Sequence, residues 1–192
     1  LKLHFAPRQT LHGTLVDIYG VGILLTGKSG IGKSECALDL VERGHRLVAD
    51  DVVQVYRKGE DVLMGTASEM LGHHMEIRGV GIINVQSMFG VEAIRIQKRI
   101  EVAVELVPWS ENIEFDRLGI EQKTISFLET DVPKVEIPVT PGKNLTVIIE
   151  AISLNHMLRV YGQDAAKDFN RRLMEELARK KRVQKYLLDD ME

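Results

Sequence analysis

The chain has 192 residues, of which 44% are hydrophobic and 28% are charged, and its formal net charge is −3. These values predict one globular domain with a full core, and they give no electrostatic reason to expect a nucleic-acid partner. A single cysteine, Cys36, excludes an internal disulfide framework and suits a reducing compartment, and no apolar run reaches the ~18 residues of a membrane span.

The first predicted elements are two strands joined by a tight turn. Residues 14–19 alternate between apolar and polar side chains, and a Gly-Val-Gly turn leads into a second apolar run over 21–26. This spacing predicts a hairpin. The second strand runs into Gly-Lys-Ser-Gly-Ile-Gly-Lys-Ser at 27–34. That sequence matches G-x-x-x-x-G-K-[ST], the phosphate-binding loop of P-loop nucleotide enzymes.

The loop and the helix after it predict a site for nucleotide phosphates. Residues 35–43 have helical apolar spacing and end at Gly44. Glycines let backbone N–H groups point at a phosphate, Lys33 adds a charge, and the Ser34 hydroxyl can bind Mg²⁺. The residues predicted to bind the cofactor are Gly27, Lys28, Ser29, Gly30, Ile31, Gly32, Lys33 and Ser34. Lys28 either touches phosphate or stays a solvated surface lysine.

An acidic pair follows the helix. Residues 46–49 predict a short strand that ends in Asp50 and Asp51, where a P-loop protein carries its Walker B acid. One carboxylate could bind Mg²⁺ directly or through water. The other could be a further metal contact, or a base that accepts a proton from an attacking hydroxyl. The sequence leaves this division open, and an Asp-Asp turn without function is the competing interpretation.

The middle of the chain predicts further strands and another candidate ligand. A strand is expected at 52–57, with a return strand after the turn that follows it. Over 73–85, charged residues, glycines and apolar residues follow one another, which predicts a loop that feeds a strand into the core. Glu76 is a candidate second Mg²⁺ ligand. The histidine pair before it does not indicate zinc, because no Cys or second His pair stands at ligand spacing.

The last third of the chain begins with three predicted strands. Residues 99–107 alternate as a half-buried strand, and residues 123–128 and 135–139 predict two more. Residues 138–143 predict a rigid loop with a basic tip. Arg117, which precedes a glycine turn, could reach a phosphate or pair with a neighbouring acid.

Two helical stretches close the chain. Residues 144–161 are strongly apolar, whereas residues from 164 to about 188 are amphipathic and highly charged. One face of the second helix carries Phe169, Leu173 and Leu177. That face is expected either to pack on its own domain or to contact a neighbouring subunit or a protein substrate.

Together these stretches resemble one family, the bacterial HPr kinase/phosphorylase, over nearly the whole chain. The matching pieces are, in order, residues 11–13, 27–34, 44–51, 75–84, 115–117 and 138–143. The resemblance implies an α/β fold: a P-loop kinase core with a mixed central sheet, like that of phosphoenolpyruvate carboxykinase, and C-terminal helices. It also implies that residues 1–192 are a single catalytic domain, without the N-terminal domain that members of the family carry.

The resemblance implies a bifunctional enzyme that regulates carbon metabolism. Such an enzyme phosphorylates a serine of HPr, the phosphocarrier protein of the sugar phosphotransferase system, with ATP or pyrophosphate as donor and Mg²⁺ as cofactor. The same site removes the phosphoryl group with inorganic phosphate and releases pyrophosphate. A cytoplasmic homohexamer with HPr as its partner, and without nucleic acid or membrane partners, is implied as well.

Carried over by position, the resemblance also assigns individual roles. The catalytic positions that it implies are His12, Lys33, Asp51 and Arg117. Lys33 would contact the donor phosphates, and Asp51 would accept the proton in phosphorylation and return it in dephosphorylation. Ser34 and Glu76 fall on the Mg²⁺ positions. Residues 138–143 match the segment tied to dephosphorylation.

Two other classes of function stay open at this level. A small-molecule P-loop kinase would carry an arginine-rich lid and a closed substrate pocket, and the sequence indicates neither. A non-catalytic nucleotide sensor would keep Lys33 and Ser34 but would need no base, so Asp51 argues against it. ATP consumption with and without HPr separates the three classes.

Overall fold

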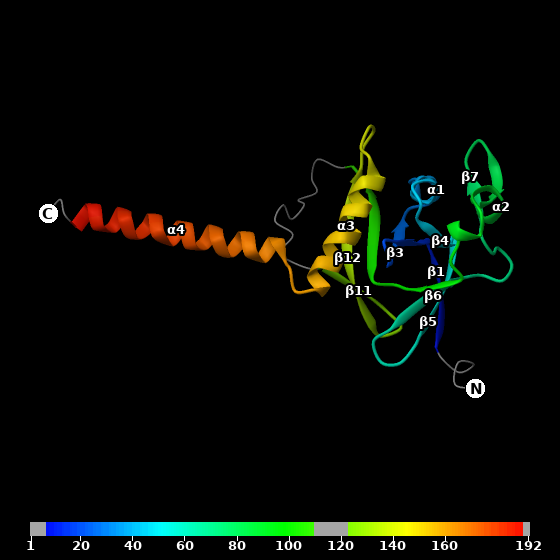
Figure 1. Ribbon diagram of the computed structural model, residues 1–192, viewed down its shortest axis with the longest axis horizontal. Coiled ribbons are helices and arrows are strands. Elements are labelled where there is room, and N and C mark those ends of the chain that lie inside the picture. The colour runs from blue at the N-terminus through cyan, green and yellow to red at the C-terminus, as the bar shows by residue number, and fades with distance from the viewer. Residues whose placement is uncertain (1–6, 110–122, 190–192) are drawn as a thin grey trace.

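The computed structural model describes residues 7–109 and 123–189, with side chains as far as residue 182. Its central sheet has six strands (Figure 1). In spatial order they are β11 (Lys123–Phe127), β12 (Thr130–Val139), β10 (Val102–Pro108), β3 (Val21–Gly27), β2 (Thr14–Ile18) and β4 (Arg46–Ala49). β10 pairs in parallel with β3 and β12, whereas the other neighbouring pairs are antiparallel. The predicted α/β fold with a mixed central sheet is therefore confirmed.

The strand that leads into the phosphate-binding loop, β3, lies in the interior of this sheet. The hairpin predicted for β2 and β3 is confirmed, because Thr14 pairs with Leu25 and Ile18 pairs with Val21. The strand after the P-loop helix does not return beside β3. β2 occupies that place, and β4 pairs with the other edge of β2. In a simple strand–helix–strand unit, the second strand pairs in parallel with the first. Here the antiparallel strand β2 takes that place beside β3.

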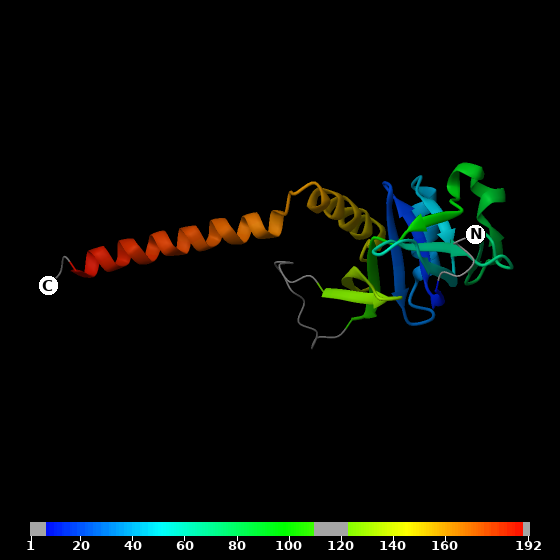
Figure 2. The same ribbon diagram turned by 90° about the horizontal axis from the view of Figure 1, so that it is seen from below.

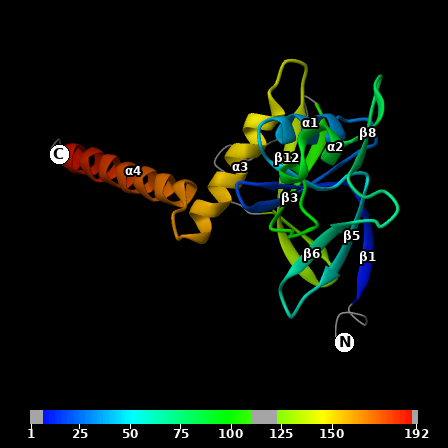
Figure 3. The same ribbon diagram turned by 45° about the vertical axis from the view of Figure 1, so that its right-hand side comes forward.

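Two layers cover the faces of the central sheet. On one face lies a second, antiparallel sheet of β1 (Arg8–His12), β5 (Val52–Arg57), β6 (Leu63–Ala67) and β9 (Gln97–Arg99). The other face carries two helices, α1 (Lys33–Glu42) and α3 (Leu145–Val160). Leu24 of β3 packs toward the second sheet and Ile23 packs toward the helices, each in its own buried cluster. Figure 3 shows β1, β5 and β6 on the side of the molecule away from α3.

A peripheral segment departs from its sequence-based prediction. It consists of β7 (His74–Ile77), β8 (Gly81–Asn84), α2 (Val85–Phe89) and the short helix η2 (Val91–Ala93). The loop predicted to feed a strand into the core is instead a two-stranded hairpin of β7 and β8. Met75 and Ile77 of β7 are buried, whereas Ile82 of β8 is 76% exposed. A lone hairpin can bury a single face against the domain, so β8 stays nearer the surface, and only Ile83 of its two isoleucines packs partly against the larger core.

The basic loop after β12 begins later than predicted. Pro138 and Val139 are the last residues of β12 and pair with β10. β11 pairs with β12 over residues 130–134, so the later part of β12 is an edge, where a proline is tolerated. The turn itself is Thr140–Lys143, and Gly142 in it has a φ of 78°.

The two C-terminal helices lie where the sequence predicts them. α4 (Ala165–Asp189) projects away from the sheets in two perpendicular views (Figures 1 and 2). Phe169, Leu173 and Leu177 on it are exposed. Packing of this face on its own domain, one of the two sequence-based alternatives, is therefore wrong. None of the described helices is long and apolar enough to cross a membrane.

Candidate active site

The phosphate-binding loop lies between the end of β3 and the start of α1. Gly30 and Gly32 have φ angles of 77° and 106°, which residues with a Cβ rarely adopt. Gly27 is needed for space, because a Cβ there would lie 2.4 Å from the carbonyl oxygen of Leu106 in β10. These glycines allow a tight loop whose backbone N–H groups can surround an anion.

Lys33 brings a positive charge to this loop. It is the first residue of α1 and is buried. Its Nζ donates hydrogen bonds to the carbonyl oxygens of Gly27, at 3.0 Å, and Lys28, at 3.1 Å. Gly32 precedes the helix without a side-chain cap, so the first N–H groups of α1 have no side-chain partner at this cap. An ammonium group and a helix N-terminus therefore meet at one place, which suits a phosphate.

Asp50 is the buried member of the acidic pair and is 4% exposed. Its carboxylate accepts hydrogen bonds from the Thr14 hydroxyl at 2.6 Å and from the Ser34 hydroxyl at 2.9 Å. Burial raises the pKa of Asp50, and the two hydroxyl bonds act against that rise. Among the described residues, no cationic side chain forms an ion pair with it. A buried carboxylate of this kind suits a nearby cation.

Asp51 has the opposite environment. Its φ is 63°, a left-handed conformation that turns the chain sharply after β4. Its side chain is 64% exposed, and Oδ1 lies 3.1 Å from Nδ1 of His12. The backbone brings these two residues together, because Gly13 N–H donates to the carbonyl oxygen of Asp51 at 3.1 Å. The two adjacent acids thus separate into a buried group on Ser34 and an exposed group on His12.

One cavity of about 280 Å³ joins these groups to the β7–β8 hairpin. It is lined by His12, Thr14, Ser29, Gly30, Gly32, Lys33, Ser34, Glu35, Asp50, Asp51, Leu71, His74, Met75, Glu76, Arg78 and Ile82. The loop lines one part of the cavity, and Glu76 and Arg78 of the hairpin segment line a neighbouring part. Residues that are far apart in the sequence therefore share a single small space.

Arg78 is a site residue that the sequence analysis did not single out. It follows β7, and one guanidinium nitrogen lies 2.5 Å from the position that a Cβ on Gly30 would occupy. The planar guanidinium carries donors that suit phosphate oxygens, and here it lies against the loop that is shaped for phosphate. The signal available in the sequence was an arginine two residues after Glu76, next to a glycine.

The oxygen ligands in the cavity suit Mg²⁺ better than a metal ion that is held by protein side chains alone. The described residues contain no group of three or more His, Cys, Asp or Glu side chains that could hold an ion. Mg²⁺ usually keeps several waters and takes one or two carboxylates together with substrate phosphates. Ser34, Asp50 and Glu76 offer oxygen atoms in the same cavity. The residues present therefore fit a metal that arrives with a phosphate donor.

The predicted site residues are only partly brought together. The loop residues that line the cavity are Ser29, Gly30, Gly32, Lys33 and Ser34. Gly27 and Lys28 contribute their carbonyl oxygens to Lys33, and Ile31 packs against the larger core. His12, Asp51 and Glu76 line the cavity, and their catalytic and metal-binding roles stay predictions. Arg117 lies outside the described residues, so its predicted role stays a prediction.

Comparisons with known proteins agree on one family. Residues 3–173 match the family model described as the HPr Serine kinase C-terminal domain. The chain is 56% identical to the HPr kinase/phosphorylase of Chloroherpeton thalassium over 174 residues, which are 91% of this chain and 51% of that protein. It is 51% identical to the enzyme of the same name from Geobacillus kaustophilus over 90% of this chain and 56% of that protein. The chain thus spans about half the length of the curated relatives it matches.

A solved structure supports the same assignment. The Hpr(Ser) kinase/phosphatase from Coxiella burnetii matches with a TM-score of 0.75 and 35% sequence identity. The match covers 84% of this chain and 98% of that one. Sequence and architecture therefore agree along most of the chain, and the chain belongs to the HPr serine kinase C-terminal domain family.

Proposed function

We propose that this chain transfers a phosphoryl group between ATP or pyrophosphate and a serine of HPr, and that it reverses the transfer with inorganic phosphate. The observation that carries the proposal is the pairing, in one cavity, of a P-loop lysine with an exposed carboxylate, Asp51. The names of the relatives supply the protein substrate and both directions. A nucleotide sensor would not need the carboxylate.

In the forward direction, the donor phosphates lie in the loop against Lys33 and the N-terminus of α1. Asp51 accepts the proton of the serine hydroxyl as its oxygen forms a bond to the terminal phosphorus, and the bond to the bridging oxygen breaks. His12, 3.1 Å from Asp51, orients that carboxylate. Mg²⁺, when bound, neutralises charge on the phosphate oxygens, and Ser34, Asp50 and Glu76 are the residues that would hold it.

The reverse direction uses the same groups. An oxygen of inorganic phosphate forms a bond to the phosphorus of phosphoserine, and the bond from that phosphorus to the serine oxygen breaks. Asp51 returns its proton to the departing serine oxygen, as microscopic reversibility requires. The product is pyrophosphate, which occupies the place of the donor phosphates. Arg117 is proposed, from the resemblance, to add charge stabilisation in both directions.

The finer fold assignment is a P-loop kinase core of the kind found in phosphoenolpyruvate carboxykinase. Its support is the antiparallel β2 beside the P-loop strand, which a simple doubly wound sheet would not have. We also assign the enzyme to the cytoplasm, which fits a free, buried Cys36 thiol.

Assembly into a homohexamer is part of the proposal. Its support is apolar surface that the described chain leaves open: Val147, Leu154 and Leu158 on α3, and Phe169, Leu173 and Leu177 on α4 are exposed. Contiguous exposed apolar residues indicate a protein interface. Truncation after Gly162 is expected to change the oligomer mass or to weaken HPr phosphorylation, while nucleotide binding persists. Unchanged mass and unchanged HPr phosphorylation would contradict this part.

The decisive experiment is mass spectrometry of HPr after incubation with this chain, Mg²⁺ and either ATP or pyrophosphate. The proposal expects one added phosphoryl group on a serine, and its removal with release of pyrophosphate when inorganic phosphate is added. ATP consumption that does not need HPr would favour a small-molecule kinase. Nucleotide binding without consumption would favour a sensor. Either result would overturn the proposal.

A further inference from the structure

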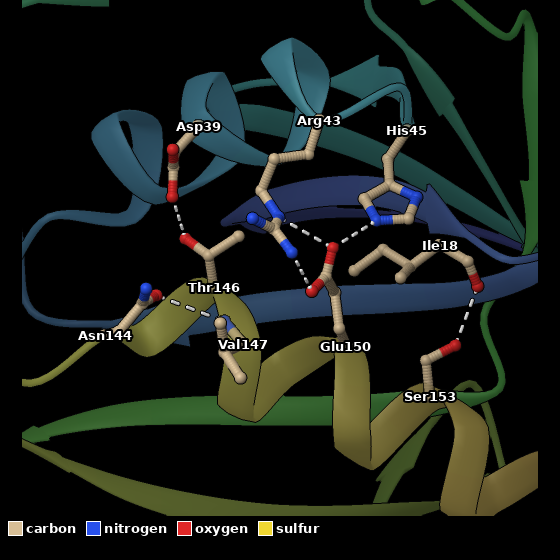
Figure 4. A network of polar contacts seen from close by, with 9 residues as sticks. All are labelled: Ile18, Asp39, Arg43, His45, Asn144, Thr146, Val147, Glu150 and Ser153. Atoms are coloured by element: carbon tan, nitrogen blue, oxygen red, sulfur yellow. Dashed lines mark hydrogen bonds and ion pairs between the residues drawn. The ribbon is translucent and has the colours of Figure 1, made fainter.

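The face that α3 turns toward the domain buries polar side chains as well as apolar ones. Thr146, Glu150 and Ser153 are buried on that face together with Ile149. Each of the three polar residues has a specific partner (Figure 4): Thr146 donates to Asp39 of α1, and Ser153 donates to the carbonyl oxygen of Ile18 at 2.7 Å. Directional bonds of this kind specify one position along the helix, whereas apolar contacts tolerate sliding.

Among these contacts, those of Glu150 have the strictest geometry. Its two carboxylate oxygens accept hydrogen bonds from Nε of Arg43 at 2.8 Å and from the terminal guanidinium nitrogen at 2.6 Å. Nε2 of His45 lies 2.9 Å from the same carboxylate. The His45 ring in turn meets Tyr19 edge to face, with 4.7 Å between ring centroids. A bidentate pair of this kind adds geometric specificity to its energy.

These contacts define the register of α3 against the P-loop helix. Asp39 with Thr146 and Arg43 with Glu150 are both 107 residues apart in the chain. A constant offset over successive turns means that the two helices run parallel and in step, because both rise by about 1.5 Å per residue. Figure 4 shows the two pairs on successive turns of both helices.

The basic turn before α3 lies at the same edge of the central sheet as the phosphate-binding loop. Leu106 of β10 pairs with Gly27 of β3 on one side and with Ile137 of β12 on the other, so β3 and β12 end close to the same level. The turn is closed by its own contacts: Lys143 Nζ donates to the carbonyl oxygen of Pro138 at 3.3 Å, and Asn144 caps α3 through the N–H of Val147. The turn therefore connects the end of β12 to α3, whose place along α1 is set by the contacts of Thr146 and Glu150.

We propose that Glu150 is a positioning residue: its bidentate contact with Arg43 sets the register of α3 on the P-loop helix and so holds the Thr140–Lys143 turn beside the phosphate-binding end of α1. Part of this inference rests on the proposed function, because the turn then brings Lys143 near the place where a second phosphate must bind. Glu150 itself lies at the opposite end of α1 from Lys33 and does not line the cavity.

The first test needs no catalysis. Hydrogen exchange is measured on the full chain carrying Glu150→Gln, with Glu42→Gln, an exposed glutamate at the end of α1, as the matched control. The expected result is exchange of the Leu145–Val147 amides faster by about tenfold, as the loss of one charge-assisted hydrogen bond implies, with β3 amides and the control unchanged. Unchanged exchange at 145–147 would overturn the proposal.

A second variant guards against general unfolding. If Glu150→Gln also exposes β3, Arg43→Lys is measured, because it keeps the positive charge but loses the bidentate geometry. Faster exchange confined to residues 140–147 in that variant supports the register role. Exchange that rises equally in β3, or in neither segment, contradicts it.

A double-mutant cycle then tests the catalytic consequence. Glu150→Gln is expected to raise the KM for inorganic phosphate severalfold and to leave ATP binding near the wild-type value. In a Lys143→Ala background it is expected to have no further effect on phosphorolysis, because the residue through which it acts is gone. Additive losses, or an equal loss of ATP binding, would mean a general structural role. If the wild-type chain shows no phosphorolysis, the proposed function fails, and the exchange experiment still decides the positioning role.

Discussion

The cavity has two walls that differ in how their side chains are held. The core wall consists of Ser29, Gly30, Gly32, Lys33 and Ser34 of the loop with Thr14 and Asp50. In it, Thr14 and Ser34 donate to Asp50, and Lys33 donates to backbone carbonyl oxygens of the loop. The outer wall consists of His12, Asp51, Glu76 and Arg78, whose side chains are largely exposed. The core wall is thus already arranged before a ligand binds, whereas the outer wall keeps its polar groups open to solvent.

This difference fits the two substrates of the proposed protein kinase. Donor phosphates are small, and a preformed set of N–H groups, an ammonium group and a hydroxyl can surround them without rearrangement. A serine on a protein surface must be reached from outside, so its base has to stand at an open edge. Asp50 and Asp51, adjacent in sequence, illustrate both requirements: one is buried on Ser34, and the other is exposed beside His12.

The largest expected effect comes from the core wall. Lys33→Ala should lower the rates of both phosphorylation and phosphorolysis by roughly a thousandfold, because the ammonium group serves any phosphate in the loop. Rates in both directions at saturating Mg²⁺ measure this, with Lys58→Ala at an exposed turn as the control. Near-wild-type phosphorolysis in Lys33→Ala would show that this lysine has no role in the mechanism that both directions share. It would then contradict the role given to the core wall.

Asp51→Asn should have the next largest effect. Loss of the base is expected to lower the transfer rate by about a hundred- to a thousandfold, while nucleotide affinity changes little because the core wall is intact. Single-turnover rates and nucleotide titrations separate the two quantities, and Asp61→Asn in an exposed turn is the matched control. An equal loss of nucleotide affinity would place Asp51 among the binding groups of the core wall.

Arg78 tests whether the outer wall also contacts phosphate. Arg78→Ala should lower kcat/KM by about tenfold or more, the effect of losing one charge-assisted hydrogen bond. Arg78→Lys should recover part of this loss, because it keeps the charge without the planar pair of donors. Steady-state kinetics with ATP and with pyrophosphate give the values. If both variants behave like wild type, the guanidinium next to Gly30 has no role in transfer.

The smallest expected effect is on stability and concerns Asp50. Its pKa is raised by burial, so its charge destabilises the folded state progressively as the pH rises above the ordinary Asp range, and has no such effect below that range. Asp50→Asn should therefore raise the Tm of the nucleotide-free protein at neutral pH, with a gain that shrinks as the pH falls toward about 4. Thermal unfolding across a pH series measures this. A gain independent of pH, or a lower Tm at neutral pH, would show that the charge of Asp50 does not destabilise the folded protein.

Several features of the fold followed from local patterns in the sequence. The hairpin of β2 and β3, the helix after the loop and the two C-terminal helices were predicted because each is encoded by consecutive residues with a regular apolar spacing. The strand at 99–107 was expected to have one exposed face, yet Ala103 and Val104 of β10 are both buried. Alternation reveals that a strand exists, but a strand inside a sheet that is covered on both faces can bury residues on either side.

The sequence by itself determined the phosphate-binding loop, because positive φ angles, a helix N-terminus and a lysine beside it are properties of eight consecutive residues. It also supplied His12, Asp51 and Glu76 as candidates. Only the tertiary structure decided that Asp50 is the buried acid and that Arg78 lies against Gly30. It also decided that α3 docks through polar as well as apolar groups, while α4 projects away from the sheets. Those outcomes depend on contacts between segments tens of residues apart. Burial and partner choice belong to the packed molecule, and no local spacing encodes them.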